Sequence, residues 1–214
     1  LKGGHLSNIK YSKLRNKKFF IDTSFLTQNI CNEVSESFQL SINKIKDSGV
    51  KIIETNFGEI GKANELASKI FPYEAYESWK NIIEENPEKM FQPVLSRFRG
   101  GVDISYSEYK DSWKQLKILR NDFYKKISTY DALISPTCPI VPPLVEKLLE
   151  NYDYFSSSNL MALRNTRVAN LFGLTSISLP TEIDNCGFML SSKPGDDISL
   201  LETGYLIEQL LLKY

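Results

Sequence analysis

The chain has 214 residues, with 26 Lys and Arg against 26 Asp and Glu, one His and three Cys. This balance argues against a general nucleic-acid-binding protein, and one His with three widely separated Cys argues against a zinc site or a disulfide framework. No metal, cofactor or membrane-spanning segment is expected, and the sequence predicts a cytoplasmic globular protein.

Residues 1–17 are polar and basic and are predicted to form a linker, so that the folded part covers residues 18–214. The single His5 lies in this linker. The first residue is Leu1 rather than Met, and we therefore expect the chain to be a piece of a longer protein.

The next segments predict a strand, a helix and a second strand. Phe19–Ile21 is a short apolar run typical of a buried strand. Val34, Phe38, Ile42 and Ile45 are spaced by three or four and predict one face of a helix that ends at Gly49. Val50–Glu54 then predicts a strand. This order indicates an α/β fold with parallel strands.

Residues 59–85 have a helical pattern that is predicted to break at Pro72, with further stops at Pro87 and Pro93. The clearest helix is predicted over residues 105–129. It begins with Ser105 and Glu108 in the spacing of a capping box. Its apolar positions form a stripe that is predicted to face a core: Tyr106, Tyr109, Trp113, Leu116, Leu119, Phe123, Ile127 and Tyr130.

The last third of the chain predicts three short strands and a final helix. The strands are Ala132–Ile134, Ser176–Leu179 and Gly187–Ser191, and residues 135–139 are predicted to leave the sheet because they contain two prolines. The helix is predicted to start at Asp196 or Asp197, with Gly204 marking a close packing contact.

The sequence shows no complete catalytic set. His5 is in the predicted linker, which argues against triads or pairs that need an imidazole. Ligands of open α/β sheets bind beyond the carboxyl ends of strands. Thr137 and Cys138 occupy that position, between Pro136 and Pro139. The loop is therefore either a ligand site or a rigid connector.

Several segments together resemble the amidase signature family. They are Gly100–Tyr109, Tyr130–Pro139 (YDALISPTCP), Arg164–Leu174 (RNTRVANLFGL), Ser176–Pro180 (SISLP), Gly187–Leu190 (GFML) and Gly195–Leu201. The resemblance covers nearly all of this chain but only the C-terminal part of the family. It implies an α/β fold in which a mixed sheet is flanked by helices.

The resemblance also implies how such enzymes work. The family uses a nucleophilic Ser, a bridging Ser and a Lys base on elements upstream of this part, and no residue here matches them. The resemblance makes Thr137, Cys138 and Arg97 candidates for substrate binding, the last because some amidotransferase-type members hold a substrate carboxylate with an Arg there. For these candidates the alternative is a surface salt bridge or a connector. Thr166 and Asn170 are expected to hold backbone groups of the sheet.

We therefore interpret the chain as the C-terminal portion of an amidase-type hydrolase that acts on carboxamide C–N bonds. Its partners would be an N-terminal amidase part and, in the complete protein, a small-molecule amide. Alone it is expected to be inactive, and to expose a sheet edge that favours association. The alternatives are a non-catalytic binding protein and an interaction module that dimerises through the stripe between Tyr106 and Tyr130.

Overall fold

The computed structural model describes residues 14–212, so His5 and most of the predicted linker lie outside the described residues. The five strands form one sheet in the order β2-β1-β3-β5-β4. β1 is parallel to β2 and β3, whereas β5 is antiparallel to β3 and β4. The sheet is therefore mixed, as the sequence predicts. The strands are β1 (Lys18–Asp22), β2 (Lys51–Thr55), β3 (Ala132–Pro136), β4 (Thr175–Pro180) and β5 (Gly187–Ser192).

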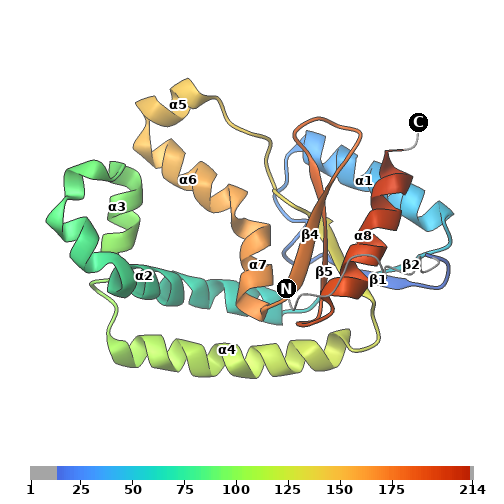
Figure 1. Cartoon of the computed structure of the whole chain (residues 1–214), viewed down its shortest axis with the longest axis horizontal. Coiled ribbons are helices and arrows are strands. Elements are labelled where there is room, and N and C mark those ends of the chain that lie inside the picture. Colours follow the sequence, from blue (N-terminus) through green and yellow to red (C-terminus); the bar gives the residue numbers. More distant parts are fainter. Residues whose placement is uncertain (1–13, 213–214) are drawn as a thin grey trace.

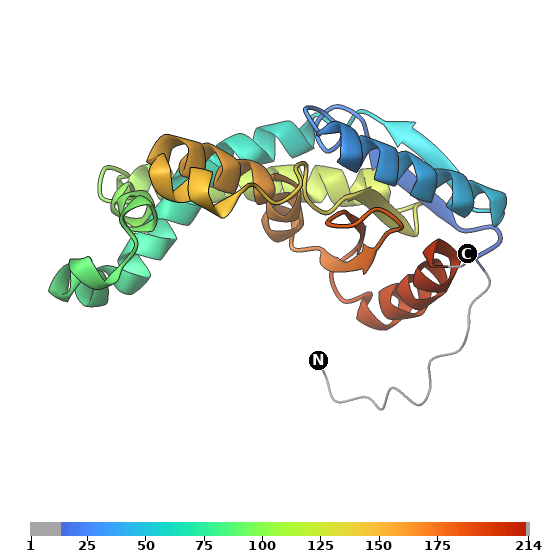
Figure 2. The ribbon, with the colours of Figure 1, turned by 90° about the horizontal axis from the view of Figure 1, so that it is seen from above.

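Helices cover both faces of this sheet (Figure 1). They are α1 (Asn32–Asp47), α2 (Glu59–Glu85), α3 (Gln92–Arg99), α4 (Tyr106–Ile127), α5 (Val145–Glu150), α6 (Tyr152–Ala162), α7 (Arg164–Phe172) and α8 (Asp197–Leu211), with a short 3-10 helix η2 at Pro87–Lys89. The parts of α2 and α4 farthest from the sheet, together with α3, α5 and α6, extend to one side of it (Figures 1 and 2).

Two apolar clusters follow from the alternation of side chains along the strands. Phe19 and Ile21 point toward α1 and α8, where they pack with residues such as Phe38 and Ile207. Phe20 points to the opposite face and packs in a cluster with residues of α2, α4 and α7. The fold is therefore a helix–sheet–helix sandwich of the α/β class.

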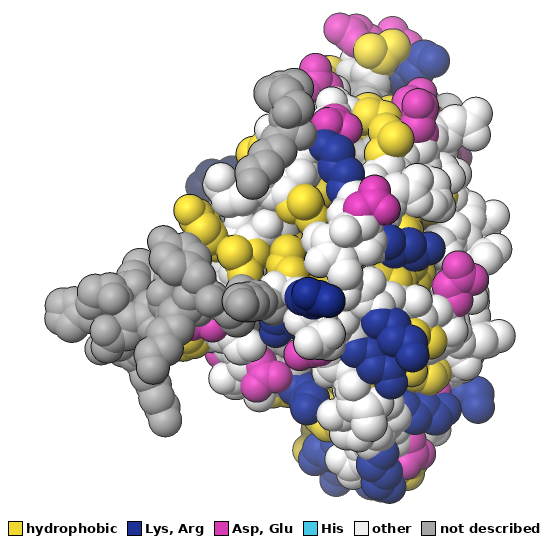
Figure 3. Space-filling model, turned by 90° about the vertical axis from the view of Figure 1, so that its right-hand side faces the viewer, with side chains coloured by type: hydrophobic (Ala, Val, Ile, Leu, Met, Phe, Trp, Pro, Cys, Tyr) yellow, Lys and Arg dark blue, Asp and Glu magenta, His cyan; other side chains and the backbone are white. Residues whose placement is uncertain are grey.

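The predicted strand–helix–strand start is confirmed. All four residues of the α1 stripe are buried, and Gly49 ends the turn after the helix with φ +89°, a conformation that glycine adopts at no steric cost. The side of the molecule that carries α1, α8 and β2 bears basic and acidic side chains intermixed, in keeping with the balanced composition (Figure 3).

Three predictions made from prolines are wrong. α2 runs unbroken through Pro72, because α3, α4 and α7 pack along it and the carbonyl that loses its donor belongs to Ser68, which is exposed. Pro93 lies in the first turn of α3 and helps to begin it rather than stopping a helix. β3 continues to Pro136, opposite Phe188 of β5.

The missing N–H of Pro136 costs no ladder bond. Its carbonyl, which points the same way as its nitrogen in a strand, accepts a hydrogen bond from Asn165 of α7 at 2.8 Å instead of pairing with β5. The pairing of β1 with β3 covers only Ala132 and Leu133. Pro136 therefore has a strand on one side only, a position that tolerates proline.

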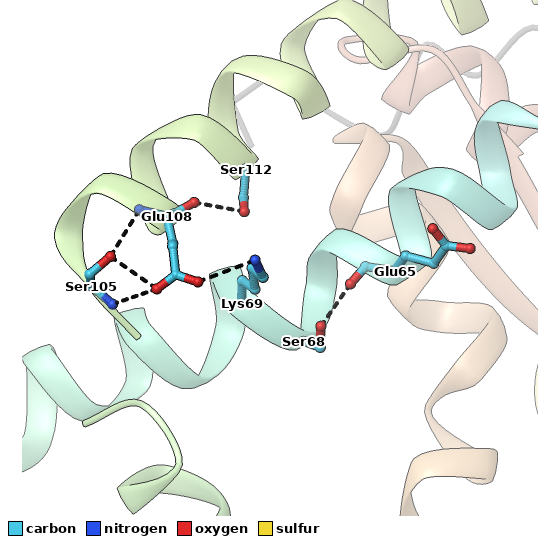
Figure 4. Close-up of polar contacts among 6 residues, drawn as sticks. All are labelled: Glu65, Ser68, Lys69, Ser105, Glu108 and Ser112. Carbon is cyan, nitrogen blue, oxygen red and sulfur yellow. Dashed lines mark hydrogen bonds and ion pairs between the residues drawn. The ribbon is translucent and has the colours of Figure 1, made fainter. Parts of the chain in front are cut away.

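The capping box of α4 is confirmed (Figure 4). The Glu108 backbone N–H donates to the Ser105 hydroxyl, and the Ser105 N–H donates to the Glu108 carboxylate. The stripe faces a core at Leu116, Phe123 and Ile127. The prediction is wrong at the first position of the stripe, because Tyr106 is 62% exposed at the outer end of the helix.

The middle of the stripe contacts α2 of the same chain. Tyr109 and Trp113 both donate hydrogen bonds to the carboxylate of Glu74 on α2. This packing leaves little of the stripe for dimerisation. The close contact predicted at Gly204 is present, since a Cβ there would lie 3.2 Å from Ile177 Cδ1 of β4.

Candidate functional site

The loop after β3 is tied to the sheet at its first residue. The Thr137 N–H donates to the Gly187 carbonyl at 2.8 Å, and its hydroxyl lies 2.6 Å from that of Ser178 on β4. Gly187 leaves room for this pair, because a Cβ there would lie 2.7 Å from Thr137 Oγ1. Thr137 therefore has a fixed position at the carboxyl end of β3.

Asn165 of α7 fixes the same strand end from the other side. It is fully buried, and its side-chain amide donates to the carbonyls of Leu26 at 3.0 Å and Pro136 at 2.8 Å. Thr166 instead donates to Leu163 within the helical segment, and Asn170 is exposed. The residue that holds the sheet is thus Asn165, next to the expected Thr166.

A second buried polar group, Asp22, ends β1. Its carboxylate accepts hydrogen bonds from the backbone N–H groups of Phe25 at 2.9 Å and Phe57 at 2.7 Å, and from the Ser24 hydroxyl. These donors occupy both of its oxygens. Asp22 therefore organises the loops that follow β1 and β2 and is not a free general base.

Cys138 is a half-buried free thiol in the loop. Burial raises its pKa above that of an ordinary cysteine, since the thiolate is disfavoured away from water. A raised pKa leaves less of the nucleophilic thiolate at neutral pH. Cys138 can therefore line a ligand site more readily than it can act as a nucleophile. The next residue, Pro139, accepts a hydrogen bond from the Cys31 N–H.

Arg97 lies in a separate place, a cavity of about 760 Å³ between α2, α3, α6 and α7. The walls are largely apolar and include Ala67, Phe71, Pro72, Ala75, Phe98 and Leu160. Arg167 of α7 also lines it. The structure does not bring Arg97 together with Thr137: α3 and the end of β3 lie apart in both views (Figures 1 and 2).

Both arginines of this cavity bind neutral acceptors. Arg97 donates to the side-chain oxygen of Asn159, and Arg167 donates to the side-chain oxygen of Asn64 at 3.3 Å. Within residues 14–212 neither forms a salt bridge, whereas the neighbouring Arg99 pairs with Glu84 at 2.6 Å. The alternative to substrate binding that the sequence left open for Arg97, a surface salt bridge, is therefore found at Arg99 and not at Arg97.

The cavity contains two guanidinium groups, those of Arg97 and Arg167, and Arg167 is partly removed from water. Burial lowers the pKa of Arg167, and the charge of Arg97 lowers it further, so the two guanidinium groups repel each other. Glu65 also lines the cavity. In Figure 4 the Glu65 backbone carbonyl accepts a hydrogen bond from the Ser68 hydroxyl, while the Glu65 carboxylate lies apart from the other labelled side chains. An anionic group would relieve the repulsion between the arginines.

Metal-binding and membrane-spanning features are absent from residues 14–212. No group of three or more His, Cys, Asp or Glu side chains there has an arrangement that could hold a metal ion. None of the helices in this part of the chain combines the length and the apolar character that crossing a membrane requires.

Motif reasoning missed two features of these sites. One is the pair of hydrogen bonds that the Asn165 amide donates, and the other is the presence of Arg167 beside Arg97 in the cavity. Both depend on contacts between residues that are distant in the sequence.

Comparison with known proteins gives a match to the family model Amidase over residues 2–201. A glutamyl-tRNA(Gln) amidotransferase subunit of Saccharolobus solfataricus is 24% identical over 199 residues, which cover 80% of this chain and 41% of that protein. The 2-amino-5-chloromuconic acid deaminase of Comamonas testosteroni is 20% identical over 202 residues, which cover 89% of this chain and 42% of that protein.

Solved structures show the same fold. An amidase crystal structure superposes with a TM-score of 0.78 at 20% identity, covering 95% of this chain and 48% of that one. Kluyveromyces lactis allophanate hydrolase gives a TM-score of 0.79 at 16% identity, covering 91% of this chain and 32% of that one. The chain therefore spans less than half the length of each of these proteins.

Proposed function

The chain belongs to the amidase family, and we propose that it is the C-terminal portion of a hydrolase that cleaves a carboxamide C–N bond or transfers the group released. The observation that carries this proposal is the family match over residues 2–201, together with the shared fold. In this proposal the nucleophile, bridging hydroxyl and lysine base belong to an N-terminal amidase part, which is the principal partner. The cytoplasmic location predicted from the sequence stays a prediction.

We assign Thr137 and Cys138 to the wall of the substrate site. Their support is the position of the loop at the carboxyl end of β3, where α/β folds bind ligands, and the rigid hold of Asn165 and Gly187 on either side. When Ser178 is the donor in the pair with Thr137, the Thr137 hydroxyl keeps its own proton for one further hydrogen bond. Such a group suits the carbonyl or amide end of a substrate.

We assign Arg97 to substrate binding on different grounds. Its cavity has the volume of a small-molecule site and a largely apolar lining, and its guanidinium has only a neutral partner among the described residues. An amide substrate that also carries a carboxylate would supply the missing charge. Arg167 then acts beside Arg97 as a second cation in the same cavity.

The test uses the polypeptide encoded by the complete reading frame that contains residues 1–214, and residues 1–214 alone. Release of ammonia or amine is measured for a panel of neutral and acidic amides. We expect hydrolysis by the complete protein and none by residues 1–214 alone. Arg97→Gln should raise KM for acidic amides at least tenfold, a loss of about 1.4 kcal/mol of binding, and leave neutral amides unchanged.

Arg99→Gln is the matched control, because Arg99 is on the same helix but pairs with Glu84 outside the cavity. Absence of amide hydrolysis by the complete protein would contradict the enzymatic proposal. It would favour the second candidate, a non-catalytic amidase-like binding protein. The observation behind that candidate is the cavity itself, whose lining combines apolar side chains with two arginines that donate only to neutral acceptors among the described residues.

A further inference from the structure

Arg97 and Arg167 line one cavity but differ in their exposure. The helices α2, α3, α6 and α7 surround this cavity (Figure 1). Arg97 of α3 is exposed, whereas Arg167 of α7 is half-buried. Water screens the charge of a buried group less than that of an exposed group, so an anion in the cavity interacts more strongly with Arg167. Arg167 is therefore the residue with the larger influence on which anions the cavity accepts.

The hydrogen bonds of Arg167 leave several of its donors unused. Its guanidinium donates to the side-chain oxygen of Asn64 at 3.3 Å and to the Leu160 carbonyl at 3.4 Å. Both distances exceed the usual range of about 2.7–3.2 Å, and both acceptors are neutral. Arg97 donates only to Asn159 among the described residues. A guanidinium has more N–H groups than these contacts occupy, and its planar fork suits a carboxylate or a phosphate.

The place of Arg167 in α7 adds to the cost of its charge. Arg164 and Arg167 both lie in the first turn of α7, which contains no acidic residue. The positive end of the helix dipole lies there, so cations in this turn are unfavourable and anions are favourable. Arg164 donates to neutral oxygens of Asn165 and Leu26. A bound anion would thus relieve an electrostatic cost that the described residues do not offset.

Two carboxylates lie near the arginines without neutralising them. Glu65 lines the cavity, and Asp153 lines an adjoining depression that Arg97 also borders. Both acidic side chains are exposed, and in the described part of the chain neither forms an ion pair with Arg97 or Arg167. Exposed charges interact weakly through water. The cavity therefore offers two guanidinium groups between apolar walls, and within residues 14–212 no counter-charge is bonded to them.

We propose that Arg167 makes this cavity selective for dianionic groups over monoanionic ones. The ligand class is a small molecule with two neighbouring carboxylates or one phosphate monoester, which share a double negative charge and several acceptor oxygens. A single charge paired with Arg97 leaves Arg167 uncompensated, whereas a double charge matches both guanidinium groups. Phe71 and Phe98 of the apolar wall can contact the carbon chain. The inference rests on the proposed function in one respect, because it takes the dianion to be the acidic end of the amide substrate.

Isothermal titration calorimetry of the complete protein tests this charge selectivity. The probes are butyrate, a monoanion, and two dianions, succinate and methyl phosphate. Succinate has the same carbon-chain length as butyrate and differs from it by one added carboxylate. We expect the better of the two dianions to bind at least about tenfold more tightly than butyrate, and the difference should shrink as salt screens the second charge. Tighter binding of succinate assigns the cavity to paired carboxylates, and tighter binding of methyl phosphate assigns it to a phosphate monoester.

Variants of Arg167 separate its role from that of Arg97. Arg167→Gln should weaken binding of the dianion at least about tenfold and that of butyrate less than about threefold, because Arg97 still holds one charge. Arg167→Lys keeps a charge without the planar fork and should give an intermediate loss. It supplies the answer where circular dichroism shows Arg167→Gln to be unfolded. Arg99→Gln is the matched control, since it removes a positive charge that pairs with Glu84 outside the cavity, and it should leave both affinities unchanged.

Glu65 gives an independent test of the charge of the ligand. Its carboxylate repels a dianion in the cavity, so Glu65→Gln should strengthen binding of the dianion by about twofold or more. A zwitterionic amino acid is the rival ligand, with its carboxylate on the arginines and its ammonium near Glu65. In that case 2-aminobutyrate binds more tightly than succinate and methyl phosphate, and Glu65→Gln weakens its binding. This result overturns the proposal.

The remaining outcomes separate this inference from the proposed function. Selective binding of a dianion without hydrolysis of any amide supports the inference and contradicts the enzyme. Hydrolysis of acidic amides by a protein that binds butyrate as tightly as both dianions does the reverse. Equal losses of dianion affinity in Arg167→Gln and Arg99→Gln also overturn the inference, since the selectivity would then reflect net charge alone.

Discussion

Replacement of Asn165 tests how the strand end beneath the candidate site is held. The Asn165 amide is the donor to two backbone carbonyls, those of Leu26 and Pro136, and no part of the residue is exposed. Each neutral hydrogen bond contributes about 1 kcal/mol net, and a buried carbonyl left without a donor costs more than that. Asn165→Ala should therefore lower the free energy of unfolding by about 2–3 kcal/mol.

Thermal unfolding followed by far-UV circular dichroism measures this loss. For a domain of this size, 1 kcal/mol corresponds to a shift of about 2–4 °C in Tm, so the expected decrease is about 5–10 °C. Asn170→Ala is the control, because Asn170 is exposed on the same helix and its replacement should change stability by no more than about 0.5 kcal/mol. Equal shifts for the two variants would refute the role assigned to Asn165.

Asn165→Asp gives a second test at the same position. One carboxylate oxygen would replace the amide nitrogen that faces the Leu26 and Pro136 carbonyls, whereas the other would keep the hydrogen bond that Arg164 Nε donates to Asn165 Oδ1 at 3.2 Å. Since an ionised carboxylate has no proton to donate, both carbonyls lose their donor and the variant should be destabilised at neutral pH by about 2–3 kcal/mol or more, measured by the same thermal unfolding.

Three further variants test the helical layer. Gly101→Ala should cost about 2 kcal/mol or more, because its Cβ would lie 2.2 Å from the Pro72 carbonyl oxygen; a loss below about 0.5 kcal/mol in urea unfolding would contradict this packing. Ser105→Ala removes the capping acceptor of α4 and should cost about 1 kcal/mol by the same assay, with Ser105→Gly costing less. Burial raises the pKa of Glu59, but the Lys126 hydrogen bond and the charges of Lys126 and Lys62 outweigh it, and the net pKa is lowered. Stability from Glu59 is thus present above its unfolded pKa and lost as pH falls through the folded pKa, and Glu59→Gln should flatten that part of the stability–pH curve.

Local patterns predicted the elements whose formation depends on local chemistry. The α1 stripe, the Gly49 turn and the α4 capping box each depend on residues within one or two helical turns, and all three are confirmed. Pro72 and Pro136 show where such reasoning ends. A proline removes one donor, but whether the element continues depends on tertiary packing. Helices pack against α2 at Pro72, and β3 has a neighbouring strand on only one side at Pro136.

The same difference between local and long-range contacts separates the residues of the candidate site. Thr137 and Cys138 could be found because their position after a strand and between prolines is visible in the sequence. Asn165 and Arg167 could not, because their acceptors are far away in the chain: Leu26 is 139 residues from Asn165, and Asn64 is 103 residues from Arg167. No periodicity connects residues at such separations. Only the placement of α7 against β3 and α2 reveals what these side chains do.

The geometry of α7 relates the two substrate-binding assignments. Asn165 and Arg167 are two residues apart, so they point to nearly opposite sides of the helix while differing by only about 3 Å along its axis. One side holds the strand end that leads to Thr137, and the other lines the cavity of Arg97. The helix thus separates the loop from the cavity. If the two proposed assignments, Thr137 and Arg97, apply to one ligand, that ligand has to pass around α7 to contact both, which requires an elongated molecule.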